Sequence, residues 1–139
     1  MNTTVLDSAK PVDQSLVTYT HVIYGLHALA VVIGLTSAAT IVGTFVWSVP
    51  SIIAVVMNYA RRNDVRGTLL ESHFTWQIRT FWYTLVWAVV ISVISFPLVL
   101  LLGLGFLTFF LGFGALGVWV LYRVVRGWLA LRDARPMYV

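Results

Sequence analysis

The sequence predicts an all-α integral membrane protein whose four transmembrane helices form two hairpins with both termini in the cytoplasm, an N-in/C-in topology. Hydrophobic residues make up 60% of the 139 residues and charged residues only 10%, against about 25% charged residues in soluble domains. So few charges cannot cover a soluble domain of this size. Residues 14–60 and 80–122 carry no charge, and each run is long enough for two helices of about 20 residues across the hydrocarbon.

Short breaks divide each uncharged run into two helices. The first break is the small and polar stretch 34–37, and the second lies within 97–105, where Gly103 and Gly105 favour a turn. The expected helices cover residues 16–35, 40–60, 69–101 and 106–131. The corresponding regions are a polar N-terminal tail (1–15), a transmembrane domain (16–131) and a cytoplasmic tail (132–139). We expect the third and fourth helices to extend past the bilayer at their cytoplasmic ends.

Pro50 lies inside the second expected helix. A proline removes one backbone donor and collides with the carbonyl four residues earlier, so we expect a kink at Pro50. The alternative is that Pro50 is the first residue of a short helix, with Ser48 near its N-cap.

The charges lie in the N-terminal tail, in residues 61–79 and in the C-terminal segment from Arg123, and are mostly positive, for a net charge of +4. Positive residues mark the cytoplasmic side of a membrane protein. Because arginines flank the apolar runs, we expect them to contact anionic lipid headgroups or a partner protein, and not nucleic acid. The arginines assigned to these contacts are Arg61, Arg62, Arg66, Arg123 and Arg126.

A glycine pattern typical of dinucleotide-binding proteins occurs at Gly112, Gly114 and Gly117. That motif functions only between a strand and a helix beside water, whereas here it lies in an uncharged membrane run. We therefore interpret these glycines as sites of close helix packing.

The start of the third expected helix carries two polar residues, His73 and Gln77, on its apolar side. Thr68 and Glu71 have the spacing of a capping box, which predicts that the helix begins there. At 100° per residue, His73 and Gln77 fall on or beside the apolar face, whereas Glu71 and Arg79 fall on the polar side. Buried polar groups need hydrogen-bond partners, so we expect His73 and Gln77 to contact polar groups of the first two helices.

The expected polar cluster lies in the cytoplasmic half of the bundle. Its candidate members are His21, Tyr24, His27, Asn58, His73 and Gln77. One interpretation is that these residues hold the helices together. The alternative is a polar cavity for a proton, an ion or a small ligand.

Other chemistry is disfavoured by composition and spacing. The chain has no cysteine, and His21 and His27 are six residues apart, which does not suit zinc. A haem between one of these histidines and His73 is conceivable, but we expect no metal, no cofactor and no catalysis.

Residues 72–79 read Ser-His-Phe-Thr-Trp-Gln-Ile-Arg, after Pro50-Ser51-Ile52-Ile53 and Arg61-Arg62. This order resembles small bacterial four-helix membrane proteins of unknown function related to the plastid import component Tic-twenty. Thr75 departs from the pattern, since the wider family favours asparagine there. The resemblance implies a multi-pass protein of the bacterial inner membrane, and the link to translocation is an analogy of fold only.

The sequence therefore predicts a non-catalytic inner-membrane protein that acts as a homo-oligomer or as an accessory subunit. Its expected partners are the lipid bilayer and either itself or another membrane protein. The alternative is a small channel or carrier for an ion, a proton or a small solute that uses the polar cluster.

Overall fold

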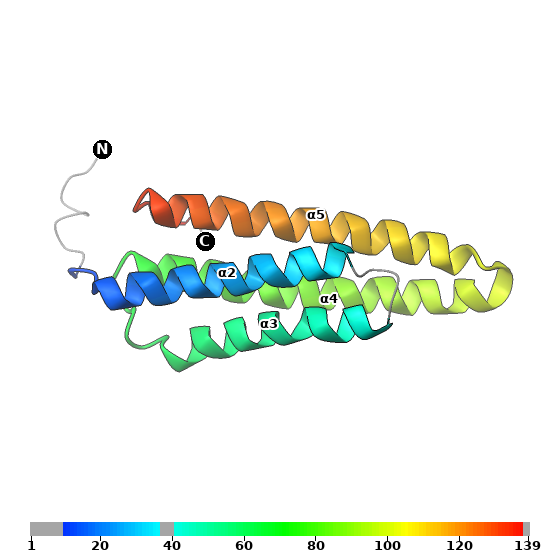
Figure 1. Ribbon diagram of the computed structural model, residues 1–139, viewed down its shortest axis with the longest axis horizontal. Coiled ribbons are helices and arrows are strands. Elements are labelled where there is room, and N and C mark those ends of the chain that lie inside the picture. The colour runs from blue at the N-terminus through cyan, green and yellow to red at the C-terminus, as the bar shows by residue number, and fades with distance from the viewer. Residues whose placement is uncertain (1–9, 37–40, 138–139) are drawn as a thin grey trace.

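The computed structural model describes residues 10–36 and 41–137, and for residues 41–47 and 102 only their backbone. This part of the chain is helical and contains no strand, which confirms the expected all-α class (Figure 1). The helices are α2 (Gln14–Thr36), α3 (Ile41–Ala60), α4 (Leu70–Leu102) and α5 (Leu104–Arg132). Three of them, α2, α4 and α5, are long and apolar enough to cross a membrane, as expected of a membrane protein.

Helix α2 begins two residues earlier than its apolar pattern predicts. The carboxylate of Asp13 accepts a hydrogen bond of 2.9 Å from the backbone N–H of Ser15, which satisfies one of the free donors at a helix start. This hydrogen bond lowers the pKa of Asp13 below its ordinary value. At its other end α2 continues to Thr36, so the break expected at 34–37 is wrong for residues 34–36, and residue 37 lies outside the described part.

Helix α4 begins at Leu70, and the capping box predicted there is not formed. The Thr68 hydroxyl accepts from the N–H of Leu70, and the Glu71 carboxylate accepts from the N–H of Gly67. Gly67 has a φ of 73°, and this turn brings its N–H within reach of Glu71. Each side chain therefore bonds to the N–H one residue before the one that a capping box requires, Leu70 in place of Glu71 and Gly67 in place of Thr68.

The turn between α4 and α5 is shorter than expected. Gly103 alone separates the helices, with a φ of 69° that glycine adopts at little cost. Helix α4 continues through Pro97, and Gly105 lies so close to the backbone of Ser95 and Val99 that a side chain would not fit.

Helix α3 continues through Pro50. Since the helix begins at Ile41, the alternative in which Pro50 starts a short helix is wrong. The kink at this position stays a prediction.

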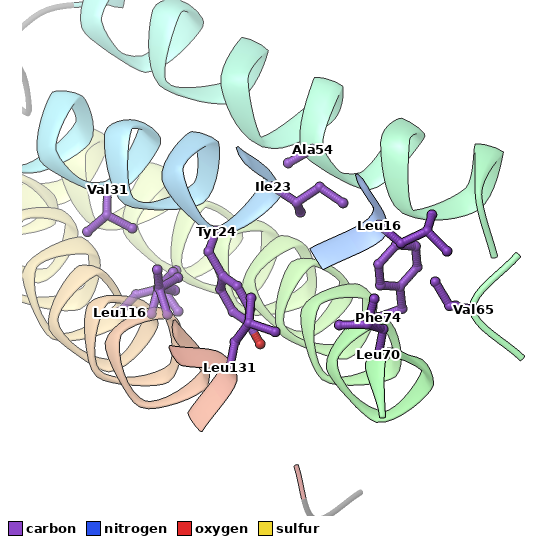
Figure 2. Close-up of a cluster of buried hydrophobic side chains, with 12 residues drawn as sticks. Leu16, Ile23, Tyr24, Val31, Ala54, Val65, Leu70, Phe74, Leu116 and Leu131 are labelled. Carbon is purple, nitrogen blue, oxygen red and sulfur yellow. The ribbon is translucent and has the colours of Figure 1, made fainter. Parts of the chain in front are cut away.

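The core joins all four helices (Figure 2). Ile23 and Tyr24 of α2 are buried together with Ala54 of α3, Phe74 of α4 and Leu116 of α5. Apolar side chains cover most of the outer surface as well, as expected for a bundle surrounded by lipid.

Two of the three motif glycines pack closely against another helix. A Cβ on Gly112 would lie 2.8 Å from Ile91 of α4, and a Cβ on Gly117 would lie 2.8 Å from Leu35 of α2. Nothing lies within 4 Å of such an atom on Gly114. The packing interpretation is therefore confirmed for Gly112 and Gly117.

Helices α4 and α5 extend beyond α2 and α3 at the end where Gly103 lies (Figure 1). Leu35, near the end of α2, packs against Gly117, which at 1.5 Å per residue is about 20 Å from Gly103. The apolar side chains of this overhang are exposed, for example Phe96 (70%) and Leu100 (75%). Relative to α2 and α3, the extra length of α4 and α5 therefore lies at the Gly103 end, and their expected extension past the bilayer at the charged end stays a prediction.

The charged segments meet at the other end of the molecule (Figure 1). The backbone N–H of Lys10 donates to the carbonyl of Gly67, 3.2 Å away, and the N–H of Met137 donates to the hydroxyl of Ser72, 3.0 Å away. Both ends of the described chain are thus tied to the segment around the start of α4.

Candidate functional site

The centre of the polar cluster is a buried contact between α2 and α4. The hydroxyl of Tyr24 lies 2.9 Å from Nδ1 of His73, and Nε2 of His73 lies 2.8 Å from the carbonyl oxygen of Arg135. A carbonyl oxygen can only accept, so Nε2 carries a proton, and the neutral ring accepts the Tyr24 hydroxyl at Nδ1. One histidine therefore links α2, α4 and the C-terminal segment.

Tyr24 is held in place by its surroundings. Its ring meets the His73 ring edge to face, at a centroid distance of 5.9 Å. On α5, Gly127 provides the space for the phenol, because a Cβ there would lie 2.5 Å from the Tyr24 hydroxyl. The packing fixes the hydroxyl opposite His73, and both residues are fully buried.

His21 takes part in a different contact from the one expected. Its Nδ1 accepts a hydrogen bond of 3.0 Å from the indole N–H of Trp128 on α5, in an exposed position. The three-residue step from His21 to Tyr24 turns the two side chains by about 60° relative to each other. His21 therefore contacts α5, whereas Tyr24 faces α4.

Three further candidates are buried but unpaired. Asn58 and Gln77 are at most 1% exposed, and His27 is 4% exposed. Among the residues that the structure describes, no hydrogen-bond partner exists for either side-chain polar atom of Asn58 and Gln77 or for Nε2 of His27. The burial expected of Gln77 is confirmed, whereas its hydrogen bond to the first two helices is not formed.

Arg123 is built into the contact between α4 and α5. Its Nε donates to the hydroxyl of Thr80 at 2.7 Å, and its guanidinium lies 3.7 Å from the centroid of the Trp76 ring. The indole N–H of Trp76 in turn donates to the Arg123 carbonyl at 3.1 Å. Arg123 thus joins two helices in addition to any contact with lipid headgroups.

The other arginines of the candidate set are exposed at the charged end. Arg61 lies 3.5 Å from the carboxylate of Asp64, and Arg126 donates to the hydroxyl of Tyr122 at 3.1 Å. Arg62 and Arg66 are fully available to solvent or headgroups. This surface suits anionic phosphate groups.

The C-terminal segment forms a tight turn before it reaches His73. Arg135 donates to the carboxylate of Asp133 at 2.6 Å, and this hydrogen bond holds the pKa of Asp133 below its ordinary value. Ala134 has a φ of 52°, the left-handed conformation that often ends helices. The N–H of Arg135 then bonds to the carbonyl of Ala130, so the turn directs the Arg135 carbonyl toward His73.

The sequence pattern missed the groups that come from α5 and the C-terminal segment. A backbone carbonyl such as that of Arg135 has no sequence signal. The groups of Trp128, Trp76 and Arg123 do have a sequence signal. Aromatic and basic residues at the ends of two membrane spans favour contacts such as the cation–π pair of Arg123 with Trp76.

In residues 10–36 and 41–137 no group of three or more histidines and acidic residues is placed to hold a metal ion. The polar contacts of the described residues join helices, and the contact between the Tyr24 hydroxyl and the His73 imidazole is fully buried. No protein-family model, no curated protein and no solved structure matches this chain.

Proposed function

We propose that the chain is a non-catalytic integral membrane protein that works as a homo-oligomer or as an accessory subunit of a membrane complex. The observation that supports this proposal best is His73, whose two ring nitrogens both lie within hydrogen-bond distance of protein atoms. Its proton-accepting nitrogen faces Tyr24 on another helix, and so does not face an open site. His73, the histidine on the apolar face of α4, therefore joins α4 to α2 and to the C-terminal segment.

The proposed topology places both termini and the segment 61–69 in the cytoplasm, with α2–α3 and α4–α5 as two hairpins. The arginines of these segments support it through the positive-inside rule. The exposed apolar overhang of α4 and α5 supports it as well, because its side chains, at the Gly103 end opposite the charged segments, favour the hydrocarbon. The motif at residues 72–79 supports a bacterial inner-membrane location and a relation to Tic-twenty-like proteins.

Topology is tested with single cysteines, since the chain has none of its own. We expect a membrane-impermeant thiol reagent to label Asn63→Cys and Ala134→Cys only after the cytoplasmic side is opened. Labelling of Asn63→Cys in intact cells contradicts the proposed topology.

Assembly is tested by purification in a mild detergent, followed by mass spectrometry and measurement of the particle mass. We expect either a defined oligomer of the chain or one foreign membrane protein in fixed stoichiometry. A monomer without a partner overturns the proposal.

A small channel or carrier is a second candidate, supported by the unpaired polar atoms of His27, Asn58 and Gln77. A conducting path needs such groups at intervals across the bilayer. The test is solute and proton flux into proteoliposomes with a pH-sensitive dye inside. We expect no flux above that of empty liposomes, and flux that Asn58→Leu abolishes favours the channel.

A further inference from the structure

A cavity of about 540 Å³ lies among the helices, next to the buried polar cluster. Its buried wall includes His27 and Val31 of α2, Thr80 of α4 and Val120 of α5. Its volume falls within the range of about 300–1,000 Å³ that is typical of small-molecule sites.

The cavity opens sideways between α3 and α4. Its rim includes Ile52 of α3 with Leu85, Val89 and Val93 of α4, and these side chains are 43–65% exposed. In a bilayer these surfaces face lipid, so the entrance connects the cavity with the hydrocarbon. This step rests on the membrane location proposed above.

The chemistry of the wall selects against charged molecules. Among the side chains that the structure describes, no lysine, arginine, aspartate or glutamate lines the cavity. The hydroxyls of Thr80 and Thr84 donate to backbone carbonyls of α4 at 2.8 and 2.6 Å. Thr80 also accepts from Arg123, so the free acceptor capacity lies mainly on the Thr84 oxygen. A charged group inside would lack a counter-ion and pay the cost of desolvation.

His27 supplies a polar atom that the described residues do not use. Its side chain contributes to the cavity wall, it is only 4% exposed, and its Nε2 has no hydrogen-bond partner in the described part of the chain. Buried polar atoms of folded proteins are nearly always paired. A hydroxyl of an uncharged ligand satisfies this nitrogen in either tautomer, because it both donates and accepts, whereas a carbonyl satisfies it only when Nε2 carries the proton.

We propose that this cavity binds an uncharged amphipathic molecule from the bilayer, with an apolar chain or ring system and one hydroxyl or carbonyl group that bonds to His27. The apolar part lies along Val31, Ala88 and Val120. The molecule enters between α3 and α4.

The test uses a long-chain primary alcohol that carries a photoreactive diazirine on its chain, mixed with purified protein in detergent. We expect cross-links on cavity residues and about tenfold less labelling by the matched alkane, the ratio that corresponds to about one hydrogen bond. Equal labelling by the alkane overturns the proposal, because it indicates contact with lipid chains only.

Two variants separate binding from folding. Thr84→Phe fills the cavity and is expected to abolish labelling, whereas Val86→Phe, on the exposed side of the same helix, leaves it unchanged. His27→Leu is expected to reduce labelling by the alcohol about tenfold without lowering the melting temperature, since Nε2 bonds to no described residue. Full labelling of either Thr84→Phe or His27→Leu contradicts the proposed site. Because the assay runs in detergent, its failure is distinct from a failure of the topology or assembly tests.

Discussion

The hydroxyl of Tyr24 on α2 and Nδ1 of His73 on α4 lie 2.9 Å apart in a fully buried position, forty-nine residues apart in the chain. Such a contact favours one register between the two helices, because a shift of either helix leaves two polar groups unpaired. In membranes interhelical hydrogen bonds contribute about 0.6 kcal/mol on average, and at most about 1.7 kcal/mol. This hydrogen bond therefore specifies the register between α2 and α4 as well as adding a modest amount to the stability of the bundle.

A double-mutant cycle measures this pair. Tyr24→Phe removes one hydrogen bond and is expected to cost about 1 kcal/mol. His73→Leu leaves both the Tyr24 hydroxyl and the Arg135 carbonyl unpaired and is expected to cost about 2 kcal/mol or more. The double variant should cost less than the sum, by about 0.5–1.5 kcal/mol, in unfolding by a denaturing detergent. Arg79→Lys, at an exposed position of the same helix, is the control, and strict additivity contradicts the coupling.

Gly127→Ala tests the space that α5 leaves for Tyr24. The added Cβ would lie 2.5 Å from the Tyr24 hydroxyl, so the ring must move away from His73. We expect a loss of about 1–3 kcal/mol, typical of overpacking, as a lower melting temperature in detergent. The matched control is Gly114→Ala on the same helix, where an added Cβ meets nothing within 4 Å. That variant should be neutral or stabilising, because alanine favours helix more than glycine does.

Ala134→Gly should stabilise the protein. Ala134 adopts a φ of 52°, and a left-handed conformation costs a non-glycine residue about 1 kcal/mol or more. Glycine removes this strain but loses more entropy on folding, so we expect a net gain of up to about 1 kcal/mol. Ala130→Gly, inside α5, is the control and should destabilise by about 1 kcal/mol. A lower melting temperature for Ala134→Gly excludes strain at this position.

Much of the fold follows from the uncharged runs, because charges avoid hydrocarbon and so limit where the membrane-spanning segments can lie. The contact of His73 with the first helix was also predictable, since a polar residue on an apolar face needs a partner, but Tyr24 was only one of several candidates. The unpaired state of Asn58 and Gln77 was not predictable, because it depends on the separation of α3 and α4. The cavity beside His27 depends on the same separation, which helical periodicity does not encode.

The C-terminal turn should respond to acid through Asp133. Its pKa is lowered by the hydrogen bond from Arg135 and, further, by Arg132, so the folded state favours the carboxylate. The contact is therefore present at neutral pH and is lost as the pH falls below the ordinary value of 3.8 and through the lowered one. We expect the amide resonance of Met137, which reports the bond to Ser72, to be constant from pH 7 to about pH 4 and to shift below. In Asp133→Asn this acid-induced shift should be absent, and its persistence assigns it to another group.

The unequal lengths of the two helix pairs give the last prediction. Thr36 ends α2 near the level of Gly117, about 20 Å short of the α4–α5 turn at 1.5 Å per residue. The exposed phenylalanines and leucines along the overhang favour hydrocarbon, so we expect the overhang to lie within the bilayer and the α4–α5 turn to reach its outer surface. We expect an impermeant thiol reagent added outside the cell to label Leu104→Cys readily and Thr36→Cys at least about tenfold more slowly, since a position below the bilayer surface meets little of a charged reagent. Both variants should react equally in detergent or denaturant, which controls for intrinsic reactivity. Equal labelling in intact cells contradicts the offset, because it places the ends of both helix pairs at the same surface.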